Sequence, residues 1–218
     1  MPMTEKHNIP TALVEYIESK IIPLYDSFDK AHRRSHVITV IEQSMQLAQH
    51  YDVDPTMVYA IAAYHDTGLC KGREVHHTES ARIVRADSRL EEFFTRAQIE
   101  TIADAVEDHR ASNSRAPRTI YGMIVAEADR IIDGNTIMSR TIQYGLAHYP
   151  ALTKEEHLDR AVQHLEEKYG HNGYLKLWIP QSANAGRLQE FRKLIDNKKE
   201  LYIELERIYS LEKGEQQQ

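Results

Sequence analysis

Residues 59–72 read YAIAAYHDTGLCKG, a largely apolar stretch that ends in a histidine, an aspartate and two glycines. His65 lies four residues after Ile61, which places its imidazole on the inward stripe of a helix. Asp66 follows directly, and Gly68 predicts the helix end, where both side chains can reach one point. Because a buried imidazole or carboxylate is costly to desolvate without compensation, the stretch predicts a helix that carries a polar pair into the core.

Two more segments place polar residues on apolar helical faces. His36 shares its face with Val40, and Asp129 lies four residues after Val125. A single histidine in this position is more often a hydrogen-bonded core residue than a ligand. Aspartate is almost never fully buried without a partner, and the simple alternative for Asp129 is an ion pair with Arg130. The joint pattern favours a common partner for all of these side chains.

A divalent metal ion where three helices meet would be such a partner. Two imidazoles and two carboxylates form a mixed nitrogen–oxygen set, which suits zinc, manganese, iron, cobalt or nickel better than calcium. Magnesium is kept as a further candidate ion. Four protein ligands on an ion that accepts five or six leave positions for water and a substrate oxygen. Metal-bound water can have a pKa of about 7, which gives hydroxide at neutral pH.

The rest of the chain is also helical in pattern. No stretch alternates with period two, and glycine and proline are sparse, at nine and seven. The pattern predicts one all-α domain over residues 1–218, with no clean linker. Helices are expected near 10–22, 36–50, 55–68, 97–109, 118–133, 135–148, 154–169 and 185–212, with another from residue 76 onward and a polar loop at 69–75.

Composition limits the function classes. The 218 residues are 41% hydrophobic and 28% charged, and a formal net charge of -6 argues against a nucleic-acid polymer as partner. No apolar run is long enough to span a bilayer, and MPMTEKHNIP at the start has no apolar signal core. Cys70 is the one cysteine, so no intramolecular disulfide can form. We therefore expect a cytoplasmic protein.

Three segments in order carry a family resemblance. AHRRSHVITVIEQSMQLA (31–48), YAIAAYHDTGLCKG (59–72) and IVAEADRIID (124–133) together resemble the HD-domain superfamily of metal-dependent phosphohydrolases, in its stand-alone bacterial form. The resemblance implies a helical bundle with residues 30–135 as the metal-binding core. Residues 136–212 would be a helical C-terminal extension packed on it. The implied metal ligands are His36, His65, Asp66 and Asp129.

Further residues fall near these ligands. His77 lines up with Ala81, so we expect its ring to face inward, and His109 also lies on an apolar face. Some members of the superfamily use such histidines for a second metal, others for phosphate. One ion is favoured here, because the extra carboxylate that a second would need is not evident. Asp66 and His109 are the candidate catalytic residues, and the candidate substrate-binding residues are Lys71, Arg73 and His77.

These observations predict a metal-dependent phosphohydrolase that acts on a small phosphate ester or anhydride, with a nucleotide as the favoured substrate. One alternative is a non-catalytic sensor that binds a phosphorylated small molecule and signals through the C-terminal helix. Two others are a two-iron oxygenase of the same superfamily and a purely structural helical protein. The stretch GRLQEFRKLIDNKKELYIELERIY (186–209) is amphipathic and would pack on the domain or on a second subunit, forming a homodimer.

Overall fold

The computed structural model describes residues 8–29, 32–113, 115–130 and 132–215. These residues form helices and connecting segments, and no strand occurs among them. The predicted all-α fold class is therefore confirmed. No helix within these ranges combines the length and the apolarity that a membrane crossing requires.

Contacts divide the chain into two compact units. The first unit contains the described residues up to Arg130 and takes in Trp178–Ser182, and the second contains those of Ile131–Leu177 and Ala183–Gln218. The predicted single domain, and the packing of residues 136–212 on the core, stay predictions.

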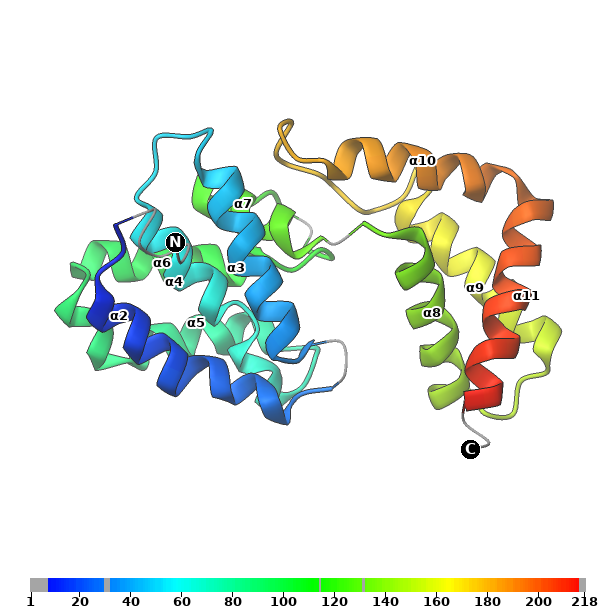
Figure 1. Cartoon of the computed structure of the whole chain (residues 1–218), viewed down its shortest axis with the longest axis horizontal. Helices are drawn as coiled ribbons and strands as arrows, with labels where there is room; N and C mark the ends of the chain where they lie inside the picture. Colours follow the sequence, from blue (N-terminus) through cyan, green and yellow to red (C-terminus); the bar gives the residue numbers. More distant parts are fainter. Residues whose placement is uncertain (1–7, 30–31, 114, 131, 216–218) are drawn as a thin grey trace. The chain divides into compact units, whose positions relative to one another are not determined.

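The first unit is built from short helices joined by tight connections (Figure 1). Its chain begins with α2 (Thr11–Tyr16), which continues as a π turn (Ile17–Ile21) and the 3₁₀ helix η2 (Ile22–Ser27). The remaining elements are α3 (Arg34–Ala48), α4 (Pro55–Tyr64), the 3₁₀ helix η4 (Thr67–Lys71), α5 (His76–Ala86), the 3₁₀ helix η5 (Ser88–Glu92), α6 (Arg96–Asp108) and α7 (Ile120–Asp129).

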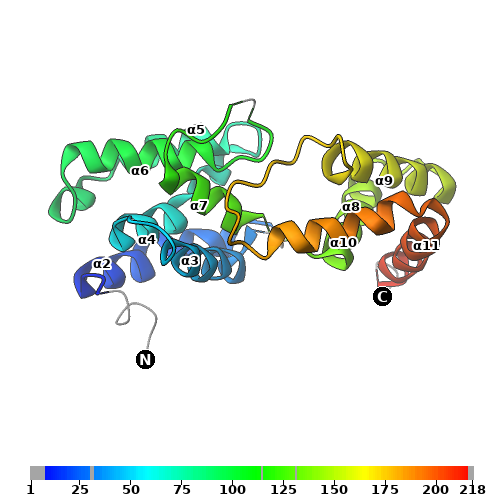
Figure 2. The same ribbon diagram turned by 90° about the horizontal axis from the view of Figure 1, so that it is seen from above.

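Helix α4 is the centre of this unit. Asp54 caps it by accepting the Thr56 N–H at 2.8 Å, and Pro55 occupies its first position, as the sequence predicts. Every residue from Met57 to Tyr64 is buried, so the helix has no solvent face. Helices α3, α6 and α7 pack against it, and α3 lies beside it in both views (Figures 1 and 2). The C-terminal end of α4 therefore lies buried inside the unit.

Several helix boundaries differ from the sequence prediction, and α4 ends at Tyr64 rather than 68. Helix α7 begins at Ile120 rather than 118, because the Thr119 hydroxyl accepts the Gly122 N–H and caps it. It ends at Asp129 rather than 133, since Arg130 leaves the helical region with φ -81° and ψ 77°. The predicted loop 69–75 is in part helical, because η4 turns through Thr67–Lys71. These boundaries leave Asp129 as the last residue of its helix.

A short segment from later in the chain completes the first unit. The Trp178 backbone N–H donates to the buried carboxylate of Glu127 at 2.7 Å. Ile179 joins the hydrophobic core, and Gln181 accepts the Tyr51 hydroxyl at 2.6 Å. The segment thus anchors helix α7 two residues before Asp129.

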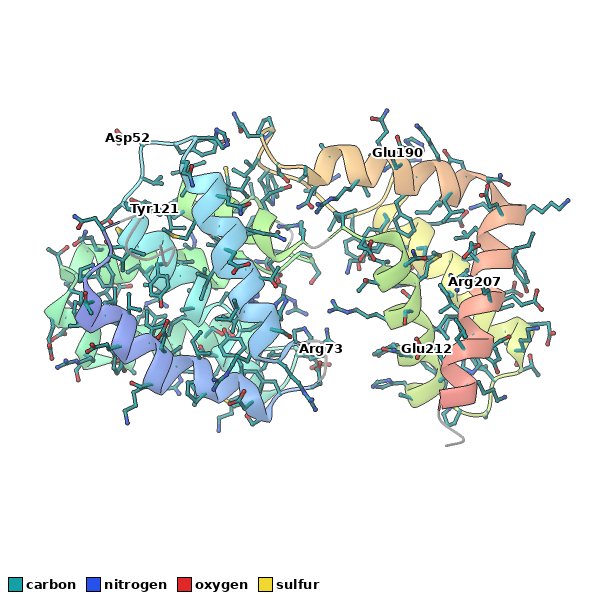
Figure 3. The ribbon with its side chains drawn as sticks, viewed as in Figure 1. Asp52, Arg73, Tyr121, Glu190, Arg207 and Glu212 are labelled. Atoms are coloured by element: carbon teal, nitrogen blue, oxygen red, sulfur yellow. The ribbon has the colours of Figure 1, made fainter. Side chains whose placement is uncertain are left out.

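The second unit is a helical assembly of α8 (Gly134–His148), α9 (Lys154–Tyr169), α10 (Asn184–Asp196) and α11 (Lys198–Glu215). Glu212 of α11 accepts hydrogen bonds from Ser139 and Gln143 of α8 (Figure 3). The single helix predicted over 185–212 is wrong, because the chain turns at Asn197 (φ -85°, ψ 78°). Asn197 caps α11 by accepting the Glu200 N–H and donating to the Glu200 carboxylate.

Candidate metal centre

The ends of three helices bring the predicted ligands together. His36 lies in the first turn of α3, His65 caps the C-terminus of α4, and Asp129 is the last residue of α7. Asp66 follows His65 at the start of η4. Because α3, α4 and α7 pack on one another, these side chains meet although up to 93 positions separate them (36 to 129).

The four side chains direct single donor atoms at a common point. His36 Nε2 lies 3.2 Å from His65 Nε2 and 3.2 Å from Asp129 Oδ1. Asp66 Oδ2 lies 3.6 Å from His36 Nε2 and 3.3 Å from His65 Nε2. The separation of His65 Nε2 from Asp129 Oδ1 is 3.8 Å. Atoms bound to one ion at about 2.1 Å lie roughly 3.0–3.4 Å apart, so these donors have nearly the spacing of a metal shell.

A second cluster lies on the other side of Asp66. Its Oδ1 atom is 3.6 Å from His76 Nε2 and 3.4 Å from His109 Nε2. The two imidazole nitrogens are 3.1 Å apart. His76 opens α5, and His109 caps the C-terminus of α6. Asp66 therefore presents one oxygen to each cluster, and both triads of donors, with Asp66 in common, could hold a metal ion.

Backbone carbonyls fix the tautomers of three histidines. The Nδ1 atom of His65 lies 2.7 Å from the Ala62 carbonyl oxygen, and the Nδ1 atom of His109 lies 2.6 Å from that of Val106. His76 makes the same contact with the Arg73 carbonyl at 2.6 Å. A carbonyl oxygen only accepts, so each Nδ1 is the donor and each Nε2 keeps a lone pair when the ring is neutral. This is the usual support of a metal-binding histidine.

The facing nitrogens require a cation between them. Two neutral imidazoles with Nδ1 protonated would direct the Nε2 lone pairs of His76 and His109 at each other over 3.1 Å. The same holds for His36 and His65, if neutral His36 also directs a lone pair inward. A proton satisfies one such contact at a time, whereas a divalent ion satisfies all ligands of a cluster together. The donor set thus fits a metal ion.

Protonation states without metal follow from the same contacts. Burial lowers the pKa of His36, but Asp129 and Asp66 outweigh it and raise that pKa to about 9. Burial also opposes charge on His109, yet Asp66 raises its pKa above the ordinary value. Burial and the charge of His109 lower the pKa of His76 to about 4. Histidine contacts hold the pKa values of Asp66 and Asp129 below normal against the effect of burial.

We expect the apparent affinity for divalent metal to rise with pH between 6 and 9. His36 is protonated in this range because its pKa is about 9, so an ion must displace that proton. The apparent affinity should then rise roughly tenfold per pH unit for each proton released. Calorimetric titration with Co²⁺ at pH 6, 7 and 8, in buffers of different ionisation enthalpy, measures both the affinity and the proton release. An affinity that does not change with pH would contradict the assignment of His36 as a ligand.

The candidate centre is more exposed at Asp129 than at His65, and a His–Arg pair lies next to each of the two clusters. Asp129 keeps 24% of its side chain exposed, whereas the side chain of His65 is fully buried. The outer His–Arg pairs are His32 with Arg73 and His77 with Arg110, with nitrogen separations of 3.5 and 3.4 Å. Ring contacts connect His32 to His36 and His77 to His76, at centroid distances of 5.7 and 5.5 Å. Arg73 lies in the connection that leads to α5 (Figure 3).

Some predicted residues lie elsewhere than expected. His76, not His77, directs its ring at Asp66, while His77 contacts Arg110. The spacing of His77 and Ala81 predicts an inward His77. In the structure, the residue of α5 that faces the centre is His76, one turn before the fully buried Ser80. Lys71 is exposed in η4. Arg130 donates to the Ala126 carbonyl within its own turn, so the contacts of Asp129 are with His36 and His65.

Comparison with known families assigns this region. Residues 33–132 match the family model of the HD domain, and the predicted resemblance to the HD-domain superfamily is confirmed. No curated protein and no solved structure matches the chain. The matched segment contains all six histidines and aspartates of the two clusters, and this His/Asp set could hold metal.

Proposed function

We propose that the chain is a metal-dependent phosphohydrolase that acts on a small phosphate ester or anhydride, with a nucleotide as the favoured substrate. The observation that carries the proposal is Asp66, whose two oxygens face separate clusters of imidazole nitrogens. We infer two ions, one held by His36, His65, Asp66 and Asp129, the other by Asp66, His76 and His109. Bound divalent ions would supply a water of lowered pKa and an electrophile for a phosphoryl oxygen.

The second ion is a change from the single ion favoured by the sequence. The carboxylate that a second ion needs would be Asp66, through the Oδ1 atom that faces His76 and His109. This also changes the role proposed for His109. Its Nε2 atom faces Asp66 and His76, and its Nδ1–H is committed to the Val106 carbonyl. A ring held at both nitrogens is suited to bind an ion rather than to move a proton.

The outer His–Arg pairs support a phosphorylated substrate. Arg73 and Arg110 form no ion pair with a carboxylate within the described residues. Guanidinium groups without a carboxylate partner suit phosphate oxygens, which they can bind with two N–H donors. Burial and the charge of Arg110 lower the pKa of His77. A neutral His77 would contact phosphate as a hydrogen-bond donor, with Lys71 as a further cation nearby in sequence.

An oxygenase with two irons is the second candidate. Two irons need more protein ligands than a single ion does. Four histidines and two aspartates now form such a set. The hydrolase is preferred because Arg73 and Arg110 form no ion pair with a carboxylate in the part of the chain that the structure describes, which suits them to phosphate. Oxygen consumption by the iron-loaded protein separates the two, since a hydrolase consumes none.

The test of the proposal combines metal analysis with a turnover screen. We expect two divalent ions per chain, hydrolysis of at least one nucleotide or generic phosphate ester, and loss of hydrolysis in chelator. Asp129→Ala should lose metal from the first cluster and most of the activity, because it removes the oxygen 3.2 Å from His36. Bound metal with no turnover on any substrate would favour the sensor instead. Unchanged metal content in the variant would remove Asp129 from the site.

A further inference from the structure

Tyr25 lies at the point where α4 ends and the His65–Asp66 pair begins. Its side chain is fully buried. The hydroxyl donates to the Ala63 carbonyl oxygen at 2.9 Å and accepts the Asp66 backbone N–H at 3.2 Å. One phenol thus joins the last turn of the helix to the residue that both clusters share.

The end of α4 shows why this contact matters. A helix leaves its last carbonyls without partners inside the helix, and buried ones must be satisfied otherwise. The Ala62 carbonyl accepts from His65 Nδ1 at 2.7 Å, and the Tyr64 carbonyl accepts from the Thr67 hydroxyl at 2.8 Å. The Ala63 carbonyl between them depends on Tyr25, which comes from a distant part of the sequence. All three bonds hold the backbone that aims His65 and Asp66.

We propose that Tyr25 is a positioning residue for the metal centre, and that its hydroxyl fixes the backbone of Asp66 so that each carboxylate oxygen faces its own cluster. This inference rests on the proposed two-ion site. The ring of Tyr25 packs beside Phe28 and His65, with centroid distances of 5.3 and 6.1 Å. Phenylalanine would keep this packing, so the hydroxyl can be tested alone.

Tyr25→Phe is expected to weaken the affinity for Co²⁺ by about 10- to 100-fold, the usual effect of removing a residue that orients a metal ligand. Without the hydroxyl, the Ala63 carbonyl and the Asp66 N–H lose their buried partner, and the chain relaxes around the pair. Calorimetry gives the affinity, and the visible absorption of bound Co²⁺ reports any change in the ligand geometry.

Tyr64→Phe is the matched control. Tyr64 is also fully buried, and its hydroxyl donates to Asp87 rather than to the backbone of the pair. It should lower thermal stability while keeping the Co²⁺ affinity and spectrum of the wild type. If Tyr25→Phe is poorly stable, sucrose can restore the folded population, but it cannot replace the lost bond, so the weakened affinity should persist.

The outcomes separate this inference from the function it rests on. A wild-type chain that binds no Co²⁺ would refute the metal centre itself. A wild-type chain that binds two ions, with Tyr25→Phe equal to it in affinity and spectrum, would refute only the role of Tyr25. Equal weakening in Tyr25→Phe and Tyr64→Phe would also refute it, because the effect would then come from general loss of stability.

Discussion

Asp66→Ala should remove both metal ions from the chain and reduce hydrolysis on the order of 10³-fold or more, as expected when an essential catalytic group is lost. Asp66 Oδ2 lies 3.3 Å from His65 Nε2, and Asp66 Oδ1 lies 3.4 Å from His109 Nε2. No other carboxylate in the described residues faces both clusters. Elemental analysis of the purified variant, together with its rate on the best substrate of the wild type, measures the effect.

Asp108→Ala is the control for Asp66→Ala. Asp108 is another buried aspartate of the same unit, one residue before His109, but its partners are Arg118 and Arg115. Its loss leaves two guanidinium groups without that carboxylate and should destabilise the fold while two ions remain bound. Circular dichroism shows whether each variant is folded. Two ions retained by folded Asp66→Ala would mean that the metal lies elsewhere.

A ligand can be predicted from the sequence where it lies on the apolar stripe of a helix. His36 precedes Val40 at helical spacing, and His65 and Asp129 follow Ile61 and Val125 at the same spacing. The donor atoms of all three lie within 3.8 Å of one another. Their spacing along the chain carries no distance information, so the family resemblance was needed to expect that they meet.

The second cluster was harder to predict for a physical reason. The stripe that carries His76 inward contains Ser80, a polar residue that is buried because its hydroxyl accepts the Gly68 N–H at 2.8 Å. An apolar pattern does not mark such a position and favours His77, which lines up with Ala81. Tyr25 was missed for a similar reason, since a tyrosine in a 3₁₀ turn has no helical period to mark it. By contrast, the break at Asn197 had a readable signal, because asparagine is a preferred N-cap residue and its side-chain oxygen accepts the N–H of Glu200, three residues later.

Gly68 explains how η4 and α5 come close enough to deliver His76. A Cβ added at residue 68 would lie 2.1 Å from the His76 carbonyl oxygen and 2.5 Å from the Ser80 nitrogen. Both are backbone atoms and cannot turn away as a side chain can. The bond from the Gly68 N–H to Ser80 depends on the same close approach. An alanine here must therefore move the first turn of α5 as a whole.

We expect Gly68→Ala to lose the ion of the second cluster, keep that of the first, and unfold more easily by about 1–3 kcal/mol or more, as overpacking does. Moving the first turn of α5 shifts His76, whose Nε2 must stay near Asp66 and His109, whereas His36 and Asp129 lie on other helices. Metal content should fall from two ions to one.

Gly186→Ala is the matched control. It lies in α10, where an added Cβ meets nothing within 4 Å, and it should keep both ions and gain up to about 1 kcal/mol from helix propensity. Two ions in a folded Gly68→Ala variant would show that His76 does not depend on this contact.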